Sequence, residues 1–126
     1  MRYTSDKDLP EITEQQFQEN LQKTKLYTVL ILKTGPRYQK PGPERDPAVT
    51  AIVKEHGKRN MALLASGIMP VVCPIGDGTN VTGIAVFDTT PEETTRIYSE
   101  DPGVRAGVFT FDVHPCRSFP GSTLPS

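Results

Sequence analysis

The stretch Ser99-Glu-Asp-Pro-Gly-Val-Arg-Ala-Gly-Val-Phe109 decides the predicted fold, because a helix ends and a strand begins within it. A residue before proline is disfavoured in the helical region, so Pro102 predicts that the upstream helix ends near Glu100. From residue 107 to 114, apolar and polar residues alternate, which is typical of a strand. The stretch therefore predicts a helix followed directly by the last strand.

Upstream of this junction, the same signals predict a helix and a hairpin. Thr90-Pro-Glu-Glu93 combines a capping box with a proline at the first helical position, so it predicts the start of the helix. Residues 81–87 alternate as a strand does. The loop at 75–80 is rich in residues that tolerate positive φ, and residues 68–74 form the other predicted strand of the hairpin.

A long helix and a first strand precede the hairpin. Asp46 as N-cap, Pro47 at the first helical position and Gly67 after the end predict a helix over 47–66. Residues 25–33 are apolar on both faces near their centre, which indicates an interior strand.

The predicted order is βαββαβ, an α+β ferredoxin-like plan with an antiparallel four-stranded sheet. Two helices can cover only one face of such a sheet, yet the strands carry apolar residues on both faces. A second copy of the chain is the expected cover, giving a homodimer of the dimeric α+β barrel type. We expect an N-terminal helical extension over 1–24, a domain over 25–117 and a C-terminal tail over 118–126.

Composition narrows the class of protein. The chain has 126 residues, of which 36% are hydrophobic, and a formal charge of −1. This balance gives no electrostatic footprint for nucleic acid, and no apolar run approaches the length of a membrane span. The N-terminus lacks the apolar core of a signal peptide. We expect a cytoplasmic protein without nucleic-acid or membrane partners, whose Cys73 and Cys116 are small buried side chains rather than a disulfide or metal site.

His56 and Asp101 are the leading candidates for chemistry. His56 lies on the apolar stripe of the 47–66 helix, where a buried imidazole needs a hydrogen-bond partner. A carboxylate on one ring nitrogen fixes the tautomer and leaves the other nitrogen to act as a base near neutral pH. Asp101 would be that carboxylate. The alternative is a buried histidine that hydrogen bonding merely satisfies.

Three passages resemble the YCII-related family of the dimeric α/β-barrel superfamily. They are Leu26–Leu32, the helix from His56 to Leu63-Leu-Ala-Ser-Gly-Ile-Met69, and Ile84–Phe87 through Glu100–Phe109 with its Asp-Pro phrase. The resemblance covers roughly residues 25–117, and the Asp-Pro phrase is its most specific part. It implies a ferredoxin-like dimer with a cleft on each subunit, and His56 and Asp101 as the proposed histidine–aspartate pair of the family.

The chain departs from the family pattern in two ways. Ser66–Ile75 lacks the glycine expected before Pro74, and the N-terminal extension and the Pro-rich loop are additions. These departures affect the shape of the pocket and therefore the substrate.

Candidate substrate-binding residues are Arg105, Arg37 and Tyr38. Arg105 follows Asp101 by four residues, so it either binds an anionic substrate or pairs with Asp101. Arg37 and Tyr38 belong to a loop over 34–46 that is too long for a mere connector. This loop either closes over an acidic or aromatic small molecule, or is a solvated loop with no specific role.

The remaining polar pair is His114 with Cys116 at the end of the last strand, and a structural role is favoured because no third metal ligand is evident. No cofactor motif is present. The predicted function is a small-molecule enzyme of the isomerase or lyase type that transfers a proton without a cofactor, on a carbonyl or lactone-like compound. The alternative is a non-catalytic binding or interaction module of the same fold.

Overall fold

The computed structural model of the chain describes residues 2–126, which form two compact units. Residues 26–116 make one unit, and residues 2–25 with 117–126 make the other. The elements along the chain are a 3-10 turn at Asp6–Asp8, α1 (Glu14–Gln22), β1 (Lys25–Thr34), α2 (Pro47–Ser66), β2 (Val71–Pro74), β3 (Val81–Phe87), α3 (Pro91–Tyr98), α4 (Pro102–Arg105) and β4 (Phe109–Ser118).

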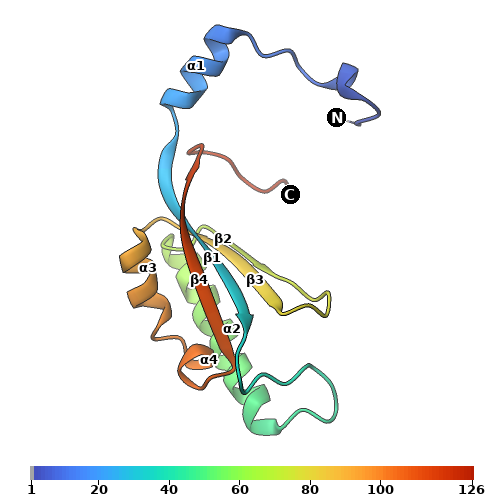
Figure 1. Cartoon of the computed structure of the whole chain (residues 1–126), viewed down its shortest axis with the longest axis vertical. Coiled ribbons are helices and arrows are strands. Elements are labelled where there is room, and N and C mark those ends of the chain that lie inside the picture. The colour runs from blue at the N-terminus through green and yellow to red at the C-terminus, as the bar shows by residue number, and fades with distance from the viewer. Residues whose placement is uncertain (1) are drawn as a thin grey trace. The chain divides into compact units, whose positions relative to one another are not determined.

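The strands form one antiparallel sheet in the order β2-β3-β1-β4. Both α2 and α3 lie on the same face of it (Figure 1). The predicted α+β ferredoxin-like fold is therefore confirmed. Leu30 on β1 and Val72 on β2 both lie opposite Ala85 on β3, and this row of side chains faces the helices.

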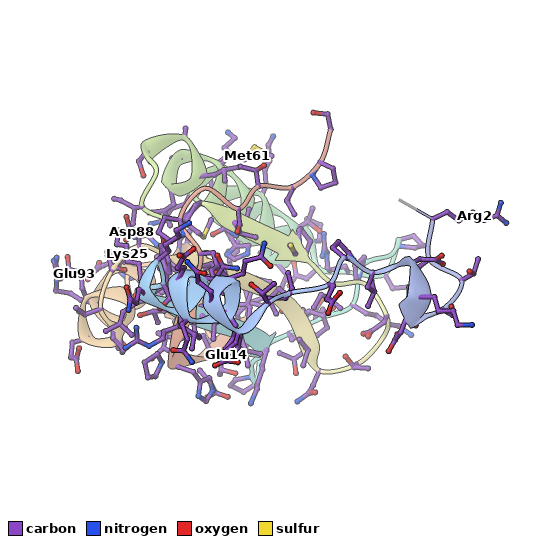
Figure 2. The ribbon with its side chains drawn as sticks, turned by 90° about the horizontal axis from the view of Figure 1, so that it is seen from above. Arg2, Glu14, Lys25, Met61, Asp88 and Glu93 are labelled. Atoms are coloured by element: carbon purple, nitrogen blue, oxygen red, sulfur yellow. The ribbon has the colours of Figure 1, made fainter. Side chains whose placement is uncertain are left out.

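The long helix α2 begins and ends where its capping residues predict. The Asp46 side chain accepts a hydrogen bond from the backbone N–H of Ala48, at 2.9 Å, and Pro47 occupies the first helical position. Gly67 ends the helix with a φ of 82°, a left-handed conformation that favours glycine. Met61 on α2 and Glu93 on α3 lie on the solvent side of their helices (Figure 2).

The core lies between this helical layer and the sheet. Its aromatic members meet edge to face, with the ring centroids of Tyr98 and Phe87 separated by 5.9 Å. The buried apolar residues are Leu30, Leu32, Val49, Met69, Ala85, Phe87, Tyr98, Val108 and Phe109. Tyr98, on α3, is 2% exposed and is the largest of the fully buried side chains.

The opposite side of the sheet, here the outer face, carries two rows of apolar side chains. Strand register aligns Val71, Val86 and Val29 in one row, and Cys73, Ile84 and Ile31 in the other. These positions alternate with the buried ones, and they are half-buried or exposed. Ile84 is 39% exposed. Within residues 26–116, both faces of the sheet are thus apolar.

The structure differs from the predictions at several element boundaries and by one additional helix. β2 begins at Val71 rather than at residue 68. β4 continues to Ser118, beyond residue 114, where the alternation predicted its end. β4 is an edge strand, where a proline without an N–H is tolerated. The short helix α4 was not predicted, because Pro102 was interpreted only as the end of the preceding helix.

The smaller unit begins with capped local structure. The Thr13 side chain accepts a hydrogen bond from the backbone N–H of Gln16, and the Gln16 side chain accepts one from the backbone N–H of Thr13, so a capping box begins α1. Phe17 and Leu21 on α1 are 49% and 47% exposed.

Candidate active site

His56 and Asp101 are in direct contact, although 45 residues separate them along the chain. The imidazole Nδ1 of His56 lies 3.0 Å from Oδ1 and 2.9 Å from Oδ2 of Asp101. His56 is 8% exposed and Asp101 is fully buried. A carboxylate can only accept hydrogen bonds when ionised, so Nδ1 carries the proton that it donates to Asp101.

The local sequence explains why Asp101 is so firmly placed. Asp101 is the N-cap of α4, and its Oδ2 accepts hydrogen bonds from the backbone N–H groups of Gly103, at 2.9 Å, and Val104, at 3.2 Å. A side chain at position 103 would lie 2.6 Å from the ring of Phe109 and 3.1 Å from Oδ2 of Asp101. Glycine at 103 therefore allows the cap, the carboxylate and the aromatic ring to meet.

Aromatic and amide groups surround the imidazole. The ring centroid of Phe109 lies 4.6 Å from that of His56, and the ring of Tyr98 meets the imidazole edge to face with centroids 6.3 Å apart. The second ring nitrogen, Nε2, lies 3.3 Å from Nδ2 of Asn60, one turn further along α2. The phenol of Tyr98 donates to Oδ1 of Asn60, at 3.0 Å. The imidazole is thus held on both of its nitrogens.

A small cavity of about 50 Å³ reaches the imidazole between α2 and the sheet. His56 and Tyr98 form its helical side, and residues of β1, β2 and β3 form the remainder, among them Leu30, Cys73 and Ala85. Its volume suits a few atoms rather than a whole substrate. It nevertheless places open space directly beside His56.

A larger cavity of about 390 Å³ lies where the Pro-rich loop meets the start of α2. Arg37 and Tyr38 line it, as do Val49 and Ile52 from the stripe of α2 that also carries His56. The ring of Phe109 stands beside both aromatic neighbours, 6.2 Å from the ring of Tyr38 and 4.6 Å from that of His56. The ring of Phe109 therefore lies between Tyr38 and His56, and His56 itself lines only the smaller of the two cavities.

Backbone contacts hold the loop that carries Arg37 and Tyr38 against the start of β4. The N–H of Gly35 donates to the carbonyl of Val108, at 2.8 Å, and the N–H of Arg37 donates to that of Gly107, at 2.9 Å. A Cβ at position 35 would lie 2.4 Å from the Gly107 carbonyl oxygen, so only glycine permits this approach. The sequence suggested a role for this loop, but it did not predict the hydrogen bonds that hold the loop against residues 107 and 108.

Arg105 does not compete with His56 for Asp101. Its guanidinium lies 3.8 Å from Oε2 of Glu100, and both of these side chains are 69% exposed. Asp101 is instead occupied by the imidazole and by the two backbone N–H groups of α4. Of the two alternatives for Arg105, the one in which its side chain pairs with Asp101 therefore differs from the structure. Arg105 lines neither of the two cavities described above.

His114 lies on the exposed side of β4, apart from the site, and Cys73 and Cys116 are half-buried free thiols. Among residues 2–126, no three His, Cys, Asp or Glu side chains gather where they could hold a metal ion. No helix within the same residues combines the length and the apolar character that crossing a membrane requires.

Asn60, Tyr98 and Phe109 are the site residues that sequence reasoning missed. Asn60 follows His56 by four residues on the same helix, and that spacing places it on the same face. Tyr98 and Phe109 had the appearance of ordinary core residues, because their contact with His56 depends on how α3 and β4 meet α2. Only the spacing of Asn60 could have been a signal.

Tyr98 makes stability depend on pH in the alkaline range. Burial raises the pKa of its phenol above the ordinary value of 10.0, and the negative charge of Asp101 raises it further. The folded protein therefore keeps a proton that the unfolded chain loses, so the stabilising contribution is complete below about pH 10 and declines as the pH rises above it. Relative to Tyr98→Phe, we expect the free energy of unfolding of the wild type to fall by about 1.4 kcal/mol per pH unit there.

Urea unfolding of both proteins between about pH 8 and about pH 11.5 measures this difference. Tyr98→Phe keeps the ring and lacks only the group that titrates, so the shared lysines and other tyrosines cancel in the comparison. Parallel curves for the two proteins across this range would show that the Tyr98 phenol titrates as it does in the unfolded chain.

Comparison with known proteins places the chain in no family. No family model matches it. No curated protein matches it either. Among solved structures, it is similar to the 5-chloro-2-hydroxyhydroquinone dehydrochlorinase TftG from Burkholderia phenoliruptrix AC1100, in complex with 2,5-dihydroxybenzoquinone, with 19% sequence identity and a TM-score of 0.42. The match covers 69% of this chain and 90% of that chain.

Proposed function

We propose that the protein is a small-molecule enzyme that transfers a proton without a cofactor, in an isomerase or lyase type of reaction on a small carbonyl or lactone-like compound. His56 is the general base or acid, and Asp101 is the residue that orients it. The observation that carries the proposal is the buried contact of both Asp101 oxygens with His56 Nδ1, beside a cavity that His56 lines. The resemblance of the sequence to the YCII-related family supports the same assignment.

The geometry supports a different role for each of the two ring nitrogens of His56. Because Nδ1 donates to Asp101, the lone pair of the neutral ring is on Nε2, and that nitrogen takes a proton from the carbon next to a carbonyl. The Asp101 carboxylate then stabilises the imidazolium, as in other histidine–carboxylate pairs. The proton returns to a different carbon in an isomerisation, or the electron pair expels a leaving group in an elimination. A site that excludes water strengthens these electrostatic effects.

The larger cavity is the proposed place for the body of the substrate. Its volume of about 390 Å³ lies within the range of small-molecule sites, and its walls combine apolar side chains with the guanidinium of Arg37 and the phenol of Tyr38. These groups favour a compound with an acidic or aromatic part. Arg105 remains a proposed anion-binding residue, as an exposed side chain that a ligand could recruit.

Deuterium uptake from D₂O tests the proposal before the reaction is known. A base that abstracts a proton next to a carbonyl exchanges that proton with solvent, even when no later step follows. A panel of small lactones, diketones and phenolic acids, incubated with the protein in D₂O and followed by proton NMR, should contain compounds whose C–H signals disappear faster than without protein. Exchange at the uncatalysed rate throughout the panel would count against the proposed chemistry.

We also propose that the protein is a homodimer, joined through the outer face of the sheet. The two apolar rows of that face, with Ile84 at 39% exposure, form a broad surface that a second sheet can cover. A two-fold axis would place the same rows of both copies against each other. We expect light scattering to give a mass about twice the 13.9 kDa of the chain.

Ile84→Glu should reduce that mass to the mass of one chain, because it buries a charge at the centre of the interface. Met61→Glu is the matched control, since Met61 is 71% exposed on α2 and lies on the other side of the sheet. A wild-type mass of one chain at micromolar concentration would contradict the dimer.

A binding module without chemistry is the second candidate, and one observation favours it. Both ring nitrogens of His56 already have partners, Asp101 on one side and Asn60 on the other. A histidine held in this way can serve only to complete a buried polar network. The D₂O experiment separates the two functions. A binding module shifts the NMR signals of Tyr38 when compounds from the panel enter the larger cavity, but it leaves the C–H signals of those compounds intact.

A further inference from the structure

Four side chains from α2, α3 and the α3–α4 junction form one continuous hydrogen-bonded chain. Asp101 contacts His56 Nδ1, His56 Nε2 contacts Asn60 Nδ2, and Asn60 Oδ1 accepts from the phenol of Tyr98. The respective distances are 2.9, 3.3 and 3.0 Å. Asp101 and Tyr98 are buried at its two ends, with exposures of 0% and 2%. The chain of contacts is therefore shielded from water at both ends.

The phenol determines which way the amide of Asn60 points. Burial raises the pKa of Tyr98, so its side chain is a neutral O–H donor across the physiological range. A donor at that position selects the oxygen of the amide, and the amide nitrogen is then directed at Nε2 of His56. The direction of every hydrogen bond in the chain follows from its two ends.

An amide nitrogen against Nε2 has a consequence for the protonation state of His56. The NH₂ group only donates, so it stabilises a ring nitrogen that has a lone pair and opposes one that has a proton. Asp101 acts on the opposite nitrogen and selects a proton there. The two neighbours thus select the same neutral form, with the proton on Nδ1 and the lone pair on Nε2.

A further charged group, Arg59, lies beside this network. Arg59 on α2 donates through Nη2 to the carbonyl of Ile97, at 2.7 Å, and its charge acts on the Tyr98 phenol. Its Nη1 is buried without a hydrogen-bond partner in residues 2–126. The group that β4 presents to the imidazole is the uncharged ring of Phe109. Asp101, Arg59 and the Tyr98 phenol are therefore the titratable or charged groups to consider.

We propose that Asn60, oriented by Tyr98, is a positioning residue that holds His56 as the neutral Nδ1–H tautomer and keeps its lone pair on Nε2. This role rests on the proposed function, in which Nε2 is unprotonated at rest and the substrate displaces the Asn60 amide before Nε2 takes its proton. The protonation state itself requires no substrate to be measured.

The direct test is nitrogen NMR of the full chain with ¹⁵N-labelled histidine at neutral pH. The two ring nitrogens of a histidine give distinct signals according to which of them carries a proton. The wild type should show His56 with a protonated Nδ1 and an unprotonated Nε2. His114 is the only other histidine, and its exposed ring serves as the reference within the same spectrum.

Asn60→Asp reverses the selection with almost no change of shape. A carboxylate oxygen in place of the amide nitrogen accepts a proton from Nε2, so His56 should become predominantly doubly protonated at neutral pH. The His114 signals should stay unchanged. A neutral His56 in folded Asn60→Asp, or a wild-type His56 with its proton on Nε2, would overturn the proposal.

Tyr98→Phe provides a second route in case Asn60→Asp does not fold. Without the phenol, the amide can rotate and present either its oxygen or its nitrogen to Nε2. We expect an Nε2–H form of His56 to appear that the wild type lacks, and its absence in folded Tyr98→Phe would overturn the role of Tyr98. If only the proposed function is wrong, the histidine spectra of the wild type and both variants are as predicted above, but no compound of the panel exchanges deuterium.

Discussion

Replacement of Asp101 by alanine should lower the free energy of unfolding by about 3 to 5 kcal/mol. The substitution removes the partner of His56 Nδ1 and the acceptor of two backbone N–H groups at the start of α4. All of these donors are left in a region where Asp101 itself is 0% exposed, so water cannot readily replace the carboxylate. The expected loss is a large part of the stability of an ordinary domain.

Urea unfolding followed by circular dichroism measures this loss, and Asp112→Ala is the matched control. Asp112 has a side-chain partner too, the ammonium group of Lys33, but the two side chains are 49% and 36% exposed on β4 and β1. Solvent screens such a pair, so its removal should have a much smaller effect than that of Asp101. Equal urea midpoints for Asp101→Ala and Asp112→Ala would show that the buried contact with His56 contributes no more to stability than the exposed ion pair does.

Replacement of His56 by asparagine should abolish proton exchange while the fold is retained. The amide nitrogen of asparagine takes the approximate place of Nδ1, so it still donates to Asp101, but the variant has no base in place of Nε2. General acid–base catalysis typically contributes about 10²- to 10⁴-fold, and we expect a loss of that order in the exchange rate. The free energy of unfolding should fall by less than in Asp101→Ala, because the buried carboxylate keeps a donor.

The effect of His56→Asn on the exchange rate, compared with its effect on stability, distinguishes a catalytic from a structural role of His56. Deuterium uptake and urea unfolding are measured on the same preparation of His56→Asn. A loss of stability as large as that of Asp101→Ala would indicate that the imidazole acts mainly as part of the core.

The fold was largely predictable because its signals are local. Asp46, Pro47 and Gly67 mark both ends of α2, and the alternation over Val81–Phe87 marks β3. The helix α4 was missed although its signals were present. Asp101 followed by Pro102 is an N-cap followed by a proline at the first helical position, which starts a helix as readily as it ends the one before.

The candidate site was predictable only in part. The need of a buried histidine for a partner predicted the contact of His56 with Asp101. The choice between His56 and Arg105 as the partner of Asp101 could not be made from spacing, because it depends on how α2 packs against the α3–α4 junction. The anchor of the Arg37–Tyr38 loop depends in the same way on the approach of Gly35 to the backbone of Gly107. Such contacts are tertiary, and no local pattern records them.

The most direct test of the central claim, that His56 is the base of a proton-transfer site, is the rate of deuterium uptake by one compound with three proteins. These are the wild type, His56→Asn and His114→Asn, which alters the only other histidine. We predict the same rate for wild type and His114→Asn, and a rate reduced about 10²-fold or more for His56→Asn. An exchange rate in folded His56→Asn equal to that of the wild type would contradict the account.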